Sequence, residues 1–275
     1  MAGRADATAR PYKGNIPPMS ESKPIVIIPA RLGSTRLPNK PLLGVAGIPM
    51  IVHVWRRAVA AGIGPVIVAC AEQEIVHVVE AEGGRAVLTA PELPSGSDRV
   101  FSALETIDPS GPGPGSTPVH DVVVNLQGDL PTIPPENIRA AVDALGPPGP
   151  PGGAADIGTL AAPLADEAER EDANVVKVAL ALAQGERRGR ALAFSRAADP
   201  VAGAELFHHI GIYAYRRAAL ARFVRLPKSE AEMAQGLEQL RAMEAGMRID
   251  AGVVDSVPLA VDTPADLERA REILG

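Results

Sequence analysis

Short apolar runs alternate with segments of helical periodicity along the first half of the chain. The apolar runs are rich in β-branched residues and predict buried strands at 25–29, 66–70, 86–88 and 122–126. Between them, apolar residues on one face predict helices at 49–61, 72–82 and 98–107. This alternation is typical of parallel strands joined by right-handed crossovers. Ligands bind such sheets at the carboxyl ends of the strands, which places the loops that begin at Ala30 and Gln127 at the predicted site.

The second half of the chain mixes further strands with helices. Strands are predicted at 158–163, 175–182, 209–215 and 248–253. One long helix is predicted at 231–245. The last helix has a clear start, with Thr263 as N-cap, Pro264 in the first helical position and Asp266 in the first turn. The whole pattern predicts an α/β fold whose mixed, mostly parallel sheet is flanked by helices.

Three segments interrupt this pattern. Residues 1–23 lack the apolar stretch of a secretory signal and are expected to form a disordered N-terminal extension. The Gly/Pro-rich runs at 111–115 and 146–153 cannot form a packed element and are predicted to be flexible surface loops. The remaining length, 24–275, suits a single domain that buries its own hydrophobic core.

Composition narrows the classes of function. A net charge of −6 and an isoelectric point near 5.5 argue against a nucleic-acid-binding protein, which needs a basic face. No uninterrupted apolar stretch is long enough to span a membrane. The single cysteine, Cys70, excludes a disulfide within the chain and suits a reducing cytoplasm. Because Cys70 ends an apolar run with no motif around it, we interpret it as a core thiol rather than a nucleophile.

The strongest chemical signal is the loop PARLGSTRLPNKP at 29–41, directly after the first predicted strand. Its cations Arg31, Arg36 and Lys40 fall within ten residues of a chain that has only five lysines. Backbone N–H groups, guanidinium forks and an ammonium can together bind phosphate oxygens, whereas a solvated basic loop is the alternative. The loop matches neither G-x-x-x-x-G-K-[ST] nor G-x-G-x-x-G, which weighs against kinases, ATPases and NAD enzymes.

Two aspartates follow predicted strands and are candidate metal ligands. Asp129 lies at the tip of a buried strand, after a glycine that permits close approach, which suits a magnesium ligand. A turn or capping role is the alternative for Asp129. Asp262 ends an extended stretch just before the last helix, where it could instead support the positive N-terminus of that helix.

These motifs resemble those of the 3-deoxy-manno-octulosonate (Kdo) cytidylyltransferase family. The loop is similar to the family's run Ile-Pro-Ala-Arg-x-x-Ser-x-Arg-Leu-Pro-x-Lys-Pro-Leu, and VDTPADL at 261–267 matches in full. In QGDLP at 127–131, Leu130 replaces the family's usual Glu. The resemblance covers 24–274 and implies a Rossmann-like nucleotidyltransferase fold, with a lobe around 155–250 for sugar binding and dimerisation.

The resemblance implies transfer of CMP from CTP to the anomeric hydroxyl of Kdo, which gives CMP-Kdo and pyrophosphate for lipopolysaccharide synthesis. Both substrates are small molecules. The expected cofactor is Mg²⁺ on Asp129 and Asp262, which would also activate the attacking hydroxyl, since no dedicated general base stands out. The implied catalytic residues are Arg31, Arg36, Lys40, Asp129 and Asp262. A cytoplasmic homodimer is expected.

The nucleotide is expected to contact two loops. The segment PSGSDR at 94–99 is similar to the family's Ser-Gly-Thr-Glu-Arg loop, which contacts the cytosine base. The same segment could cap a helix through Ser97, and the two roles are compatible. The implied nucleotide-binding residues are Pro29, Ala30, Arg31, Leu32, Ser95, Gly96, Arg99 and Gln127.

The sugar site follows from the resemblance of three further segments, at 194–196, 208–216 and 237–241. Its implied residues are Gln127, Arg196, His209, Tyr213, Glu238 and Gln239. His209 and Tyr213 are four positions apart and would share one face of a strand. A histidine on a strand can also be a satisfied core residue, which is the alternative for His209.

Two alternatives to this function remain at the level of sequence. The first is a cytidylyltransferase for another sugar acid, such as 8-amino-Kdo or a sialic acid. It is motivated by departures from the family pattern, namely Ala69-Cys70-Ala71 where an aspartate is common and the atypical stretch 231–236. The second is a nucleotide-binding module without catalysis, against which the two aspartates and three cations argue.

Overall fold

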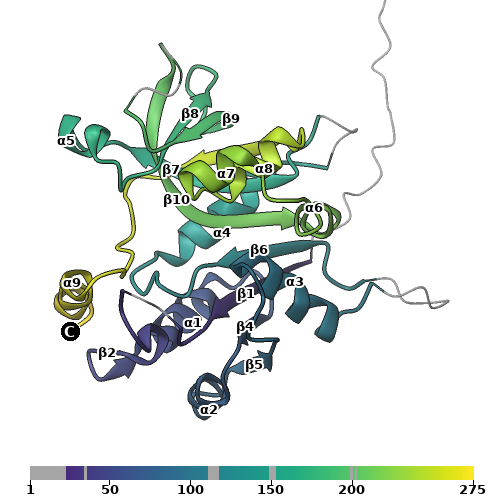
Figure 1. The fold of residues 1–275 in the computed structure, drawn as a ribbon, viewed down its shortest axis with the longest axis vertical. Coiled ribbons are helices and arrows are strands. Elements are labelled where there is room, and N and C mark those ends of the chain that lie inside the picture. The colour runs from purple at the N-terminus through teal and green to yellow at the C-terminus, as the bar shows by residue number, and fades with distance from the viewer. Residues whose placement is uncertain (1–22, 34–35, 111–117, 149–152, 199–200, 202) are drawn as a thin grey trace, which may run out of the picture.

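The computed structural model describes residues 23–33, 36–110, 118–148, 153–198, 201 and 203–275 (Figure 1). The predictions for 1–22, for 111–115 and for the centre of 146–153 lie outside these residues.

The main sheet of the described residues has nine strands in the order β5-β4-β1-β6-β10-β7-β11-β9-β8. Its strands are β1 (Pro24–Ala30), β4 (Val66–Cys70), β5 (Arg85–Leu88), β6 (Val122–Leu126), β7 (Ile157–Pro163), β8 (Lys177–Ala181), β9 (Arg188–Ser195), β10 (Glu205–Arg216) and β11 (Ile249–Val253).

The sheet is mixed. Strands β5, β4, β1 and β6 run parallel, as the alternation of apolar runs and helices predicts. Strand β10 then pairs antiparallel with β6 and β7, while β11 runs parallel to β7. A separate pair of short strands, β2 (Gly44–Val45) and β3 (Ile48–Pro49), precedes the first helix. The α/β class predicted from the sequence is therefore confirmed.

Helices cover both faces of the parallel part of the sheet (Figure 1). On β1, Val26 and Ile28 face one apolar cluster, whereas Ile25 and Ile27 face another. The first cluster receives α1 (Met50–Ala61), α2 (Gln73–Ala81) and α4 (Pro135–Asp143), and the second receives α3 (Gly96–Ile107), α6 (Arg217–Phe223) and α8 (Gln239–Glu244). Burial on both faces explains why the parallel strands are continuous apolar runs rather than alternating ones.

The prediction of one long helix at 231–245 is wrong. The chain forms α7 (Glu230–Gln235) and α8 instead, with a break at Gly236. Ser229 and Glu232 form a capping box at the start of α7, and Gly236 ends it with a φ of 65°. A left-handed glycine terminates a helix even where the apolar periodicity continues beyond it. The predicted elements include no specific counterpart for several others, namely the strands β2, β3 and β9 and the helices α4, α5 (Glu167–Glu171) and α6.

The last helix begins as predicted. Thr263 accepts a hydrogen bond from the backbone N–H of Asp266, and the two residues form a reciprocal capping box at the start of α9 (Pro264–Leu274). Leu267 and Ala270 pack α9 against Leu37 and Val45, which flank the short 3₁₀-helix η1 (Lys40–Leu42). The C-terminal helix therefore supports the loop that carries the predicted phosphate-binding cations.

Cys70 is a core thiol, as predicted. Its side chain is fully buried, and burial together with the nearby Glu72 raises the pKa of the thiol to about 12. A thiol with so high a pKa holds its proton at neutral pH and is a poor nucleophile. Among the described residues, no helix is both long and apolar enough to cross a bilayer.

Candidate active site

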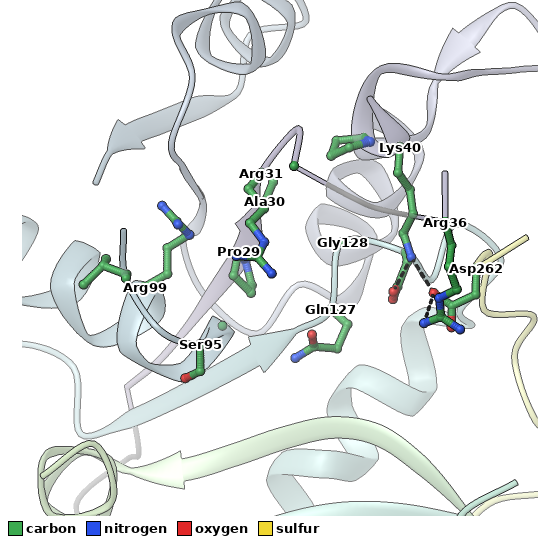
Figure 2. A pocket seen from close by; sticks show the side chains of 15 residues that line it. Pro29, Ala30, Arg31, Arg36, Lys40, Ser95, Arg99, Gln127, Gly128 and Asp262 are labelled. Atoms are coloured by element: carbon green, nitrogen blue, oxygen red, sulfur yellow. Dashed lines mark hydrogen bonds and ion pairs between the residues drawn. The ribbon is translucent and has the colours of Figure 1, made fainter. Parts of the chain in front are cut away.

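A pocket of about 400 Å³ opens at the carboxyl ends of β1 and β6 (Figure 2). Its walls come from the loop after β1, from the start of α3, from the loop after β6 and from the segment before α9. The described residues that line it are Pro29, Ala30, Arg31, Gly33, Arg36, Lys40, Pro41, Leu93, Ser95, Gly96, Arg99, Gln127, Gly128, Asp129 and Asp262. This is the position predicted from the alternation of strands and helices.

Close packing at Gly128 brings the two central loops together. A Cβ atom at this position would lie 3.0 Å from the backbone oxygen of Pro29, which is closer than side-chain carbons normally approach. A glycine before Asp129 therefore lets the loop after β6 lie against the loop after β1. The backbone N–H of Val261 donates to the oxygen of Asp129 at 2.9 Å, which brings the segment before α9 to the same place.

Lys40 lies between the two predicted metal ligands. Its Nζ donates to Oδ2 of Asp129 at 2.8 Å and to Oδ1 of Asp262 at 2.9 Å (Figure 2). Burial alone would lower the pKa of Lys40, but the two carboxylates outweigh it and raise that pKa. Lys40 therefore stays charged, and the two carboxylates converge on one cation-sized position.

The other two loop cations are more exposed. Arg36 lies 3.5 Å from Oδ1 of Asp262, and its side chain is 70% exposed. An ion pair this exposed contributes little to stability, so Arg36 can exchange its partner for a ligand at small cost. Arg31 is also exposed and lines the pocket. Both guanidinium groups are thus available to an anion that enters the pocket.

The N-terminus of α3 forms another wall of the pocket. Ser95 is the N-cap and accepts a hydrogen bond from the backbone N–H of Asp98 at 3.2 Å. The segment thus caps a helix, as its alternative role suggested, but through Ser95 rather than Ser97. Ser97 lies within the first turn and points its hydroxyl at Glu238 instead. Because the N-terminal end of a helix carries partial positive charge, this wall favours an anionic ligand.

Arg99 lines the pocket but is largely occupied by the protein. Its guanidinium donates to Oγ1 of Thr89 at 2.5 Å, to the oxygen of Ala90 at 3.2 Å and to the oxygen of Pro91 at 3.3 Å. The residue is only 2% exposed. Arg99 thus holds the segment after β5 against α3, a role that the motif alone did not reveal.

Leu32 and Leu130 lie beside the pocket rather than in its lining. Leu32, a predicted nucleotide contact, packs against the apolar cluster that covers one face of the sheet. Leu130 is 5% exposed and belongs to the same cluster. A leucine where the family usually has Glu is therefore accommodated by burial in the core.

The predicted sugar-binding residues lie outside the described lining of this pocket, except Gln127. Arg196 donates to the backbone oxygens of Gln235, Ala173 and Asn174. Gln239 starts α8 and is buried. Glu238 precedes α8 and pairs with Arg241 at 2.7 Å. The structure therefore brings together the nucleotide-side predictions except Leu32, whereas the sugar-side predictions other than Gln127 lie on β10, just after β9 and at the start of α8.

His209 and Tyr213 do share one side of β10, with their ring centroids 5.6 Å apart. A register shift interrupts the pairing of β10 with β7 between Ile210 and Tyr213, so this contact does not follow from regular alternation. Nε2 of His209 lies 3.0 Å from Oγ1 of Thr159. Burial, and to a lesser degree the neighbouring His208, lowers the pKa of His209 to about 3. His209 is therefore neutral at physiological pH and suited to hydrogen bonding rather than to charge pairing.

One functional candidate was missed although the sequence carried a signal for it. Asn125 interrupts the otherwise apolar run of β6 and is only 1% exposed. Its side chain accepts a hydrogen bond from Nε2 of Gln127 at 3.0 Å. A polar residue inside a strand that is buried on both faces needs a partner, and here that partner is a pocket residue.

Comparisons with known proteins agree with this geometry. A family model described as cytidylyltransferase matches residues 25–249. A protein of Methylorubrum extorquens (strain PA1) named 3-deoxy-manno-octulosonate cytidylyltransferase is 58% identical over 92% of this chain and 97% of its own length. A protein of the same name from Parvibaculum lavamentivorans is 53% identical over 100% of this chain and 98% of its own length.

Two solved structures extend the comparison. The structure of CMP:2-keto-3-deoxy-manno-octonic acid synthetase complexed with CTP is 37% identical and has a TM-score of 0.79, covering 92% of this chain and 98% of that chain. The structure of 4-diphosphocytidyl-2C-methyl-D-erythritol synthase is 15% identical with a TM-score of 0.60 over 93% of this chain and 99% of that chain, a likeness of fold alone. On the family model and the near-full-length relatives together, the chain belongs to the 3-deoxy-manno-octulosonate cytidylyltransferase family.

Proposed function

We propose that this chain transfers CMP from CTP to the anomeric hydroxyl of Kdo and releases pyrophosphate. The observation that carries the proposal is the convergence of Asp129, Asp262 and the cationic loop on one pocket, in a chain that belongs to the Kdo cytidylyltransferase family. The relative solved with CTP, which shares the fold over 92% of this chain, supports CTP as the nucleotide.

The residues of the pocket act by positioning and by charge. Arg31, Arg36 and Lys40 offset the negative charge of the triphosphate and of the leaving pyrophosphate. The N-terminus of α3 adds backbone dipoles to the same wall. In-line attack of the sugar hydroxyl on the α-phosphorus requires little covalent chemistry from the protein, because the main task is to hold the two substrates in line.

We further propose that Mg²⁺ is the cofactor and that Asp129 and Asp262 hold it. The Lys40 ammonium lies within 2.9 Å of both carboxylates, so a cation already fits between them. Within the described residues, no group of three or more His, Cys, Asp or Glu side chains could hold a metal, so phosphate oxygens and water would complete the ligand set. When bound, Mg²⁺ would neutralise phosphate charge and lower the pKa of the attacking hydroxyl.

The cellular setting is also part of the proposal. The expected product, CMP-Kdo, would serve lipopolysaccharide synthesis, because Kdo is a component of lipopolysaccharide. We propose that the enzyme works in the cytoplasm, where a free thiol such as Cys70 is stable. We also propose a homodimer that associates through the lobe around 155–250.

A panel of sugar acids tests the choice of substrate. Pyrophosphate release from CTP and Mg²⁺ should be fast with Kdo and at least about tenfold slower with 8-amino-Kdo or a sialic acid, because losing or misplacing one hydrogen bond in a polar site costs about that factor. Omission of the sugar is the control. Fast release with another sugar acid and none with Kdo would contradict the assignment. CTP binding without release on any sugar would favour a nucleotide-binding module.

A further inference from the structure

A chain of hydrogen bonds leads from the pocket to helix α8. Nε2 of Gln127 donates to Oδ1 of Asn125 at 3.0 Å. Nδ2 of Asn125 donates to Oγ of Ser97 at 3.3 Å. Oγ of Ser97 donates to Oε2 of Glu238 at 3.1 Å. Three elements, β6, α3 and α8, are thereby joined beneath the pocket, and the sequence predictions assigned no role to Asn125 in this region.

The two central residues of this series of hydrogen bonds, Asn125 and Ser97, are shielded from water. Asn125 and Ser97 are each only 1% exposed. Buried amide and hydroxyl groups without partners are costly, so these two side chains depend on each other and on their outer partners. The chain is therefore expected to keep one arrangement rather than to fluctuate among several.

The carboxylate at the far end of the chain sets the direction of every bond in it. An ionised Glu238 can only accept, so Ser97 must donate to it and can then accept from Asn125. Nδ2 of Asn125 consequently faces Ser97, and Oδ1 of Asn125 faces Gln127. Tyr215 also lies within hydrogen-bond reach of Ser97. The charged carboxylate of Glu238 is nevertheless the stronger acceptor for the hydroxyl proton of Ser97.

Glu238 is itself held in place. Its second oxygen, Oε1, accepts from Arg241 at 2.7 Å. Arg241 is 5% exposed, and its guanidinium carbon lies 4.3 Å from the ring centroid of Phe223. Nε of Arg241 also lies 3.5 Å from Oε2 of Glu232. The acceptor end of the chain is therefore anchored on α7, α8 and α6.

At the pocket end, the direction of these hydrogen bonds determines which atom of Gln127 is presented to a ligand. Because one N–H of Nε2 donates to Asn125, the orientation of the amide is fixed and its oxygen, Oε1, is left to accept from a ligand. That oxygen lies 3.8 Å from the position a Cβ atom would take at Gly96, which is a pocket residue. Figure 2 shows the amide oxygen of Gln127 turned toward the loop that carries Pro29, with the nitrogen on the other side.

We propose that Ser97 and Asn125 are positioning residues that hold Gln127 with its carbonyl oxygen toward the pocket, so that the site accepts a hydrogen bond from a hydroxyl or amino group of a substrate. This inference rests on the proposed function and deepens it. A phosphate has no such donor, so the group belongs either to the sugar acid or to CTP, in which the amino group of cytosine is a further donor beside the ribose hydroxyls. Replacement of Ser97 interrupts this series of hydrogen bonds without removing any group that contacts the ligand.

Steady-state kinetics distinguish the two sources of the donor group. Ser97→Ala is expected to lower kcat/KM about tenfold for the substrate that supplies the donor group, which appears as a rise of one KM, and to leave the other KM within about twofold. Ser102→Ala, the same substitution further along α3, is the matched control and should retain wild-type kinetics. Equal kinetics for the two variants would overturn the inference.

A double-mutant cycle separates positioning from general weakening. If Ser97 acts through Gln127, adding Ser97→Ala to Gln127→Ala should change kcat/KM by less than about twofold, since the oriented group is already gone. Fully additive losses would show that Ser97 acts by another route. Melting temperatures of all variants identify any loss that comes from instability alone.

A measurement without turnover keeps the inference independent of the sugar assignment. In protein labelled with ¹⁵N-glutamine, hydrogen exchange of the Gln127 side-chain amide should quicken about tenfold in Ser97→Ala and not in Ser102→Ala. An unchanged exchange rate would overturn the inference. A wild-type protein that is inactive on every sugar acid would instead overturn the proposed function, and the exchange result would still stand.

Discussion

Replacing Asp129 with Asn is expected to lower the rate of CMP transfer roughly a thousandfold, the loss typical of removing one group that stabilises charge in a transition state. The substitution keeps the shape of the side chain but removes one of the two carboxylates that converge on Lys40. On the proposal that both aspartates hold Mg²⁺, Asp262 alone is expected to bind the ion more weakly than the pair does. Pyrophosphate release at saturating CTP and Kdo, repeated over a Mg²⁺ titration, measures the effect.

The control for this prediction is Asp143→Asn, a matched change at an exposed position on α4. It should leave the rate within about twofold of wild type, as expected of a surface position away from the site. If Asp129→Asn keeps more than about a tenth of the wild-type turnover, the role assigned to this carboxylate is contradicted, because removal of such a group costs far more than that. A melting temperature close to that of wild type would show that the loss is chemical rather than structural.

Arg217→Met is expected to lower the free energy of unfolding by about 3 kcal/mol, because it leaves the buried carboxylate of Asp108 without its charge partner. Arg217 donates to Asp108 at 2.7 Å and to Glu105 at 2.9 Å, which ties the start of α6 to the end of α3. Arg217 is 8% exposed and Asp108 is 9% exposed. Chemical denaturation followed by circular dichroism measures the change.

The pH dependence of stability gives the same network a second test. Burial alone would raise the pKa of Asp108, but hydrogen bonds from the backbone of His120 and Val119, together with Arg217, outweigh it and lower that pKa. Since the folded pKa lies below the unfolded value of about 4, this contribution to stability is complete at neutral pH and is lost as the pH falls through the folded pKa. Without Arg217, less stability should be lost on acidification.

Arg222→Met is the matched control for Arg217→Met, because Arg222 lies on the same helix and is exposed. Its loss should be below about 1 kcal/mol, as for most surface substitutions. Equal losses for the two variants would contradict the importance of the buried network. The importance of this network would also be contradicted if Arg217→Met lost as much stability on acidification as the wild type does.

The parallel half of the fold and the phosphate loop could be predicted from the sequence because local patterns determine them. The strands that become β1, β4 and β6 are buried on both faces and are therefore read as continuous apolar runs. Strands of this kind end at the same edge of the sheet, so the loop after β1 and Asp129 could be expected to meet. The helix signals around Thr263 were likewise local and correct.

The parts that failed depend on contacts between distant segments or on single backbone angles. Gly236 divides a stretch whose apolar pattern favours one helix, and only its left-handed φ of 65° shows the break. The position of Lys40 between the two carboxylates joins residues separated by 89 and 222 positions, and no local pattern contains that information. The motif that contains Arg99 likewise gave no sign that backbone oxygens occupy its guanidinium.

Oxygen-18 labelling tests most directly whether the anomeric hydroxyl of the sugar attacks the α-phosphorus of CTP in this enzyme. Kdo labelled at its anomeric oxygen, CTP and Mg²⁺ are combined with the protein, and the products are followed by ³¹P NMR. The isotope is expected in the phosphodiester oxygen between the sugar and CMP, with unlabelled pyrophosphate as the second product. A sugar nucleotide without the label, or label found in the pyrophosphate, would contradict the proposed reaction.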